Sequence, residues 1–246
     1  MFNPLIYPDW PAPDTVQAVS TTRQGGFSLP PFDGLNLGLH VGDHAHNVEK
    51  NRVHLIEIAK LPESPRWLNQ VHGTMVSTAS TWQNGDDADA IISTKTNQVC
   101  AIMTADCLPI LLCNQQGTTV AAIHAGWRSL AAGIIEKTLV QFNCPPHEII
   151  AWFGPAIGPT QFEVGTDVYQ SFSQHSEHAQ QAFVQTDATH YLADIYLLAK
   201  QRLNTQNIHA IFGGDFCTVS EPDQFFSYRR DGITGRMASM IWTTDK

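Results

Sequence analysis

Two residues in the stretch TADCLPILLCNQQGTTVAAIHAGWR (residues 104–128) have side chains that could do chemistry, Cys107 and His124. Cys107 stands at the start of one apolar run, and His124 stands at the end of the next. A cysteine and a histidine can bind one metal ion, zinc above all, or act together as a nucleophile and its base. The alternative interpretation is structural, because a lone cysteine in an apolar strand usually fills a core and a histidine at a strand end usually bonds to the backbone.

The two apolar runs in this stretch predict a β-hairpin that would bring the two side chains together. With Gln115 and Gln116 as a two-residue loop, Cys107 lies directly opposite His124, and their Cβ atoms are about 4.5–5.5 Å apart on one face. Pro109 is the weak point of this register, because it cannot donate to the strand ladder and could introduce a bulge. A different loop length would also break the alignment.

His72, in the motif NQVHG, and three further histidines are the other candidates for metal binding. Two histidines and a cysteine can form a three-ligand zinc set with an open fourth position, although no local spacing links His72 to the other two. His40, His44 and His46 form a denser cluster at a helix start, which we interpret as exposed surface. The acidic run at residues 86–89 could bind a divalent cation, but such runs more often form a turn before a strand.

Arginines near His124 and near the C-terminus could bind an anion. Arg128 stands where a strand feeds a helix, whose unpaired backbone N–H groups favour negative charge. Its guanidinium could form two hydrogen bonds with a phosphate or a carboxylate, or a structural ion pair. Arg229 and Arg230, in a glycine-bounded loop of an otherwise acidic chain, could complete the anion site, with one of the two structural or facing solvent.

The elements that must position these residues are interleaved strands and helices. Because the hairpin excludes a purely parallel sheet, the sequence predicts a mixed α+β fold in which residues 1–246 form a single domain. Asp43 is expected to cap the first helix. The predicted strands cover residues 15–23, 66–73, 88–93, 108–113, 118–124, 147–153, 208–213 and the end of the tail, and the predicted helices cover residues 44–60, 129–142, 165–182 and 191–206.

The composition is typical of an ordered globular protein, because 43% of the 246 residues are hydrophobic and glycine and proline are scattered. The net charge of −9 argues against non-specific binding to nucleic-acid polymers or membrane surfaces. No segment reads as a signal peptide or a membrane span, and the five cysteines, an odd number, leave at least one thiol free. We therefore expect a cytoplasmic protein that acts on a small molecule and has no obligate protein partner.

Six motifs stand in order along the chain: NQVHG (69–73), DADAIIS (87–93), TADCLPILL (104–112), HAGWR (124–128), FGPAIGPTQFEVG (153–165) and SYRRDGITGR (227–236). Together they resemble the YfiH family, whose members are described as purine nucleoside phosphorylases and, earlier, as laccase-domain polyphenol oxidases. The resemblance implies a layered αββα fold similar to that of cysteine hydrolases. It also implies a zinc ion held by His72, Cys107 and His124, which would be the catalytic residues as well. One departure is Ser129, where many members have glycine.

The resemblance further implies phosphorolysis of adenosine, inosine, guanosine or methylthioadenosine, together with deamination of adenosine. A nucleoside and phosphate are then the small-molecule partners, and we expect contacts to them from Asn69, Asp106, Arg128 and Arg230. Asp106 is also a candidate acid–base group, or a residue that orients a zinc-bound group.

Two other hypotheses for function remain. The first is an amide hydrolase, acting on a peptidoglycan precursor, with Cys107 as nucleophile and His124 as base. The second, which we disfavour, is copper-dependent oxidation of phenols, because multicopper centres need several His-x-His pairs and the only such pair is His44 with His46.

Overall fold

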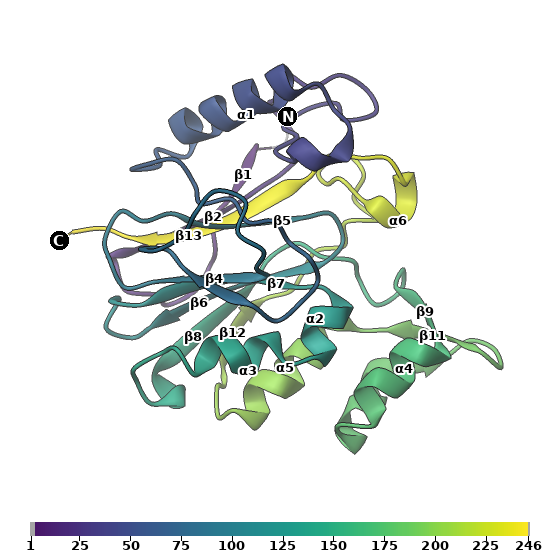
Figure 1. The fold of residues 1–246 in the computed structure, drawn as a ribbon. Coiled ribbons are helices and arrows are strands. Elements are labelled where there is room, and N and C mark those ends of the chain that lie inside the picture. The colour runs from purple at the N-terminus through teal and green to yellow at the C-terminus, as the bar shows by residue number, and fades with distance from the viewer. Residues whose placement is uncertain (1–2, 246) are drawn as a thin grey trace.

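Two β-sheets packed face to face form the centre of the structure, and helices cover the outer face of each sheet (Figure 1). The computed structural model describes residues 3–245. The layers follow the order helix, sheet, sheet, helix, so the predicted mixed α+β fold is confirmed.

The larger sheet has six strands and contains the hairpin. Its order is β12-β8-β6-β7-β4-β3, and only the two edge pairs, β12 with β8 and β3 with β4, are parallel. The four inner strands are buried along their whole length, as expected for a sheet covered on both faces. The strands are β3 (Val76–Thr78), β4 (Ala90–Ser93), β6 (Leu108–Asn114), β7 (Val120–Ala125), β8 (Ile149–Phe153) and β12 (Ala210–Gly213).

The smaller central sheet has four antiparallel strands in the order β1-β2-β13-β5. Helix α1 (Ala45–Ile58) covers its outer face, where Leu55 packs in one cluster with Val19 and Met240. A short 3₁₀ helix, η1 (Leu39–Val41), precedes α1. The strands are β1 (Leu5–Ile6), β2 (Val16–Thr21), β5 (Cys100–Thr104) and β13 (Met237–Thr243).

Helices α2, α3, α4 and α5 cover the outer face of the six-stranded sheet, whereas the short α6 lies near the start of β13 (Figure 1). A third, small sheet in the order β10-β11-β9 lies beside α4. The helices are α2 (Trp127–Ala131), α3 (Ile134–Leu139), α4 (Thr166–Ser173) and α5 (Ile195–Thr205), with short turns at η2 (Pro146–Glu148), η3 (Glu177–Ala182) and α6 (Tyr228–Asp231). The strands of the small sheet are β9 (Glu163–Gly165), β10 (Phe183–Gln185) and β11 (His190–Ala193).

Side chains on the inner strands alternate between two cores. On β6, Ile110 faces the helices whereas Leu111 faces the four-stranded sheet, and on β7 Ile123 and Ala122 divide in the same way. Odd positions of β6 and even positions of β7 therefore point into the space between the two sheets. This alternation also sets the direction of the side chains of Cys107, directly before β6, and His124, in β7.

The predicted hairpin forms, but its register is wrong by two residues. Leu108 pairs with Ala125 and Pro109 with His124, because the loop is longer than two residues and Asn114 bonds to Thr119 across its base. The Asn114 side chain accepts the backbone N–H groups of residues 118 and 119, which stabilises this longer turn. Since the error is an even number of residues, Cys107 still points to the same face as His124, diagonally rather than directly opposite.

Several element boundaries also differ from the predictions. The predicted helix 129–142 is two short helices, because Gly133 lies between them in the left-handed region with φ 94°. The segment predicted as a helix at 191–206 begins as strand β11 and becomes α5 only where Asp194 caps it. The segment predicted as a helix at 165–182 contains α4 and η3 separately.

Two further predictions near the N-terminal half are corrected. Asp43 does not cap α1; His44 occupies the cap position, and the Asp43 carboxylate instead accepts hydrogen bonds from Ser28 and Asn36. Residues 66–73 do not form a strand and make only isolated bridges to neighbouring segments. No helix within residues 3–245 is long and apolar enough to cross a membrane. All five cysteines have free thiols.

The core between the two sheets supports the strand ends, so its integrity can be tested by Leu111→Ala. Leu111 has no exposed surface, and its truncation is expected to lower the free energy of unfolding by about 2–5 kcal/mol. Urea denaturation followed by tryptophan fluorescence measures the change. Val140→Ala, at a position that is 83% exposed, is the control and should change stability by no more than about 0.5 kcal/mol. Equal effects of the two substitutions would contradict this description of the core.

Candidate metal centre and its cavity

His72, Cys107 and His124 come together at one end of the two central sheets. Their ligand atoms all lie within 4.8 Å of one another, and the Cys107 Sγ is 3.8 Å from the His72 Nε2. The rings of His72 and His124 meet edge to face, with centroids 4.7 Å apart. Within residues 3–245 this is the only group of three or more such side chains placed to hold a metal ion.

Three different segments supply these side chains. His124 lies in β7 and is 3% exposed, and Cys107 lies directly before β6, where its parity points it between the sheets. His72 lies in an exposed loop with φ 58°, a left-handed conformation that is uncommon for histidine. The hairpin therefore positions two donors through sheet geometry, whereas the third depends on a loop that other contacts must hold.

Asp89 provides those contacts. Its carboxylate accepts hydrogen bonds from the backbone N–H of His72 at 3.0 Å and of Gly73 at 2.6 Å, which hold the loop in its left-handed turn. It also bonds to the Nδ1 of His124 at 2.7 Å, so that Nε2 is the nitrogen of His124 left for a metal. Asp89 has no exposed surface and lies directly before β4, the strand that pairs with β7.

Gly126 leaves the space in which the three candidate ligands meet. A Cβ at this position would lie 2.9 Å from the His72 ring, 3.2 Å from the Cys107 Sγ and 3.5 Å from the His124 ring. Its backbone angles, φ −60° and ψ 154°, are accessible to any residue. The glycine is therefore required here by the closeness of the three side chains and not by the backbone conformation.

The electrostatics of the group favour a thiolate. Burial alone would raise the pKa of Cys107, but the charge and hydrogen bonding of His124 outweigh it and bring that pKa below its ordinary value. Burial likewise opposes the charge on His124, yet the nearby thiolate and the carboxylate of Asp89 raise its pKa. For Asp89, burial acts against ionisation, and the bonds from His124 and Gly73 lower the pKa.

The donor set fits a zinc ion. One thiolate sulfur and two imidazole nitrogens are the ligands that zinc prefers, and three of them leave one position open in tetrahedral geometry. A carboxylate behind one of the histidines is the usual partner of a metal-binding imidazole. The separation of the donor atoms, all within 4.8 Å, is also what shared coordination needs.

A cavity of about 390 Å³ adjoins the three donor side chains. Its volume is within the range of small-molecule binding sites, and its walls combine apolar and aromatic side chains with two arginines. The lining residues are His40, Gln70, His72, Met103, Thr104, Ala105, Asp106, Cys107, His124, Trp127, Ile157, Phe162, Ile195, Tyr228, Arg229 and Arg236.

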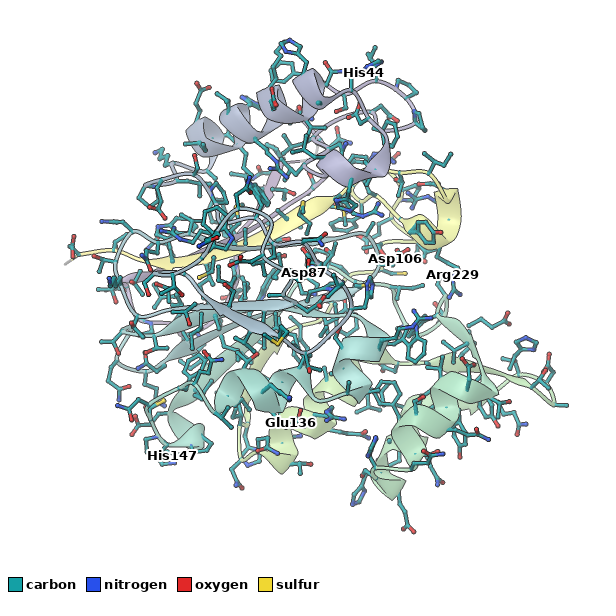
Figure 2. The ribbon with its side chains drawn as sticks, viewed as in Figure 1. His44, Asp87, Asp106, Glu136, His147 and Arg229 are labelled. Carbon is teal, nitrogen blue, oxygen red and sulfur yellow. The ribbon has the colours of Figure 1, made fainter. Side chains whose placement is uncertain are left out.

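Asp106 lies in this cavity with both carboxylate oxygens already bonded. Oδ1 accepts from the hydroxyl of Thr218 at 2.5 Å, and Oδ2 accepts from the backbone N–H of Arg229 at 2.6 Å. Figure 2 shows Asp106 and Arg229 close together at the end of the sheets nearest α6. The side chain thus fastens the loop at residues 227–236 to the wall of the cavity.

Three of the residues predicted to contact substrate lie outside the cavity lining. Asn69 is exposed and donates to the carboxylate of Asp87 at 2.5 Å. Arg128 is exposed, and its guanidinium lies 4.4 Å from the ring centroid of Trp127. Arg230 donates to backbone carbonyls, among them that of Phe225, and pairs with Asp231.

Sequence reasoning missed four residues of this region, whereas of the predicted arginine pair it is Arg229 that lines the cavity. His40 lines the cavity, whereas His44 lies on the outer layer beside α1, away from the site (Figure 2). The other three missed residues are Asp89, Gly126 and Arg236. The sequence holds a signal for Asp89. It is the last acidic residue before β4, and β4 pairs with β7, so its carboxylate can reach His124. For Arg236 the sequence holds no local signal.

Comparison with known proteins relates this chain to one family along nearly its whole length. Residues 17–244 match the family described as multi-copper polyphenol oxidoreductase laccase. The purine nucleoside phosphorylase YfiH of Escherichia coli (strain K12) is 53% identical over 239 residues, covering 97% of this chain and 98% of that protein. A purine nucleoside phosphorylase of Haemophilus influenzae is 49% identical over 240 residues, covering 96% and 98%.

Solved structures agree with this relationship. A Neisseria meningitidis protein superposes with a TM-score of 0.95 at 45% identity, covering 99% of this chain and all of the other. The YlmD protein of Geobacillus stearothermophilus superposes with a TM-score of 0.92 at 28% identity, covering 100% and 98%. The fold described above is therefore shared by proteins of known structure.

The steric role of Gly126 predicts that Gly126→Ala weakens metal binding. The added methyl group must displace a ligand side chain, so the affinity for zinc is expected to fall at least about tenfold. Competition with a chromophoric chelator measures it. Gly73→Ala is the matched control, because a Cβ there meets nothing closer than 3.5 Å. Unchanged affinity in Gly126→Ala would show that the ligands do not meet around this glycine.

The role of Asp89 predicts that Asp89→Asn lowers zinc affinity by about 10–100-fold. An amide nitrogen would face the backbone N–H of Gly73, a donor, so the loop of His72 would lose part of its support. Asp87→Asn is the control, since Asp87 is exposed and contacts Asn69 outside the cavity. If both variants bind zinc as the unmodified protein does, Asp89 does not orient the ligands.

Proposed function

Because this chain belongs to the laccase-domain family that includes YfiH, we propose that it is a zinc-dependent purine nucleoside enzyme. It would cleave adenosine, inosine, guanosine or methylthioadenosine with phosphate and would deaminate adenosine. The observation that carries the proposal is the meeting of His72, Cys107 and His124 at a cavity large enough for a nucleoside. These three residues are the proposed metal ligands and catalytic residues.

The cavity suits a purine in shape and polarity. Trp127, Phe162 and Tyr228 offer aromatic surfaces, and Met103 and Ile157 add apolar wall. A flat heterocycle gains stacking and apolar contacts on such surfaces. Tyr228 is 62% exposed, so it would lie at the solvent side of the bound base.

For phosphorolysis, the main task of the protein is to hold phosphate in line with the C1′–N9 bond of the nucleoside. An oxygen of hydrogen phosphate forms a bond to C1′ of the ribose while the bond from C1′ to N9 breaks. The electron pair of that bond leaves with the purine, which takes the proton of hydrogen phosphate. The products are the free base and ribose 1-phosphate, or 5-methylthioribose 1-phosphate when the substrate is methylthioadenosine.

Deamination uses the same substrate with water in place of phosphate, replacing the amino group at C6 and releasing ammonia. A zinc ion held by the three ligands would supply Lewis-acid chemistry and lower the pKa of water. Asp89 would keep His124 oriented throughout.

Copper oxidation of phenols remains disfavoured in spite of the family's description. A multicopper centre needs several groups of histidines, and residues 3–245 contain a single three-residue group with metal-ligand geometry. His44 and His46, the only His-x-His pair, belong to no such group.

The arrangement of Cys107, His124 and Asp89 supports a second candidate function, an amide hydrolase acting on a peptidoglycan precursor. A lowered thiol pKa, a neighbouring imidazole and a carboxylate on the far nitrogen of that imidazole are also the parts of a cysteine nucleophile with its base. The two functions differ in whether the thiolate binds a metal or attacks the substrate.

Product analysis tests the leading proposal. Protein loaded with zinc and incubated with adenosine is expected to release adenine and ribose 1-phosphate only when phosphate is present, and inosine with or without phosphate. Removal of zinc with a chelator should abolish both products, and zinc should restore them. Cys107→Ala and His124→Ala should lose zinc and both activities. Unchanged phosphorolysis in either variant, or full activity without metal, would contradict the proposal. If amide cleavage then depended on Cys107, the hydrolase would be favoured.

A further inference from the structure

Arg236 is held rigidly at the wall of the cavity. It is half-buried, its Nη1 donates to the carbonyls of Thr234 and Gly235, both at 3.0 Å, and its backbone N–H donates to Asn36 at 2.9 Å. Gly38 makes room for it, because a Cβ at that glycine would lie 2.9 Å from the Arg236 Cγ. These contacts hold the side chain against the wall of the cavity.

The guanidinium nevertheless has unused donors. Within the described part of the chain, neither Nε nor Nη2 of Arg236 donates a hydrogen bond, and no carboxylate lies within ion-pair distance. Arg202 and Arg230, by contrast, pair with Glu136 and Asp231. A guanidinium with two free donors on one edge can bind a phosphate or a carboxylate through two parallel hydrogen bonds.

The surroundings of Arg236 leave the anion position open. Asp106 and Cys107 are close enough to favour the charged arginine, although burial still holds its pKa below the usual range. The carboxylate of Asp106 is already satisfied by Thr218 and by the backbone N–H of Arg229. The acidic group nearest to Arg236 in the cavity is thus committed to other partners.

His40 faces the same space. It lines the cavity from η1, and burial together with the charges of Arg236 and Arg52 lowers its pKa. Its imidazole offers an N–H donor whichever tautomer is present. Within residues 3–245, no hydrogen bond of this ring to the protein is present, so the donor is available to a ligand.

We propose that Arg236 and His40 form the binding site for inorganic phosphate in this cavity. The Nε and Nη2 of Arg236 would form two parallel hydrogen bonds with the phosphate oxygens, and the His40 ring would add a third. The inference rests on the proposed function and assigns its second substrate to residues other than Arg128 and Arg230, which lie outside the lining.

Steady-state kinetics with varied phosphate test the assignment. Arg236→Gln is expected to raise the KM for phosphate by about 10–100-fold, with a much smaller change in the KM for adenosine. Arg236→Lys keeps the charge but loses the paired donors and should raise it by about tenfold. His40→Asn is expected to raise it by about 2–10-fold, whereas His44→Asn, on the outer layer, should match the unmodified protein.

Direct binding separates failure of this assignment from failure of the proposed function. Isothermal titration of zinc-loaded protein with inorganic phosphate, against sodium chloride of equal ionic strength, should show binding that Arg236→Gln abolishes. Zinc content and thermal midpoint of each variant verify that the fold and metal site persist. The assignment is overturned if phosphate binding and its KM survive Arg236→Gln and His40→Asn, or if Arg128→Gln alone removes them. Absence of any phosphorolysis by the unmodified protein would refute the proposed function. The titration would still show whether Arg236 and His40 bind phosphate.

Discussion

The hydrogen bonds to the Asp89 carboxylate are the interactions on which the site depends most. One buried side chain fixes the tautomer of His124 and the backbone of the loop that carries His72, so two of the three donors share a single support. The third, Cys107, lies directly before β6, whose pairing with β7 brings it near His124. Such a division explains how a loop in a left-handed conformation can hold a candidate metal ligand in place, because its strain is offset by two bonds to a buried carboxylate.

The sequence was informative where side-chain periodicity determines structure. The face shared by Cys107 and His124 follows from strand parity, and parity survives a register error of two residues. The mixed fold and the buried inner strands follow from alternating hydrophobic runs. The exact pairing did not follow, because the Asn114 side chain stabilises a longer turn than the shortest loop the sequence allows.

What sequence reasoning could not find are contacts between segments far apart along the chain. Arg230 and Arg236 both belong to one basic motif, yet one is bonded to Asp231 and backbone carbonyls while the other lines the cavity. Their difference depends on how the loop before β13 packs against Gly38. The resemblance to a family supplied His72, which no local spacing could have joined to the other two candidate ligands, Cys107 and His124.

The placement of β13 has a consequence for how the protein is made. This strand is the last along the described chain, yet it is inserted between β2 and β5 in the middle of its sheet. During synthesis, the edges of β2 and β5 that pair with β13 stay unpaired until residues 237–243 leave the ribosome. The four-stranded sheet, and with it the part of the cavity wall that Arg236 forms, is therefore complete only after this strand has been translated. A nascent chain that stalls earlier exposes the unpaired edges of β2 and β5 to neighbouring molecules.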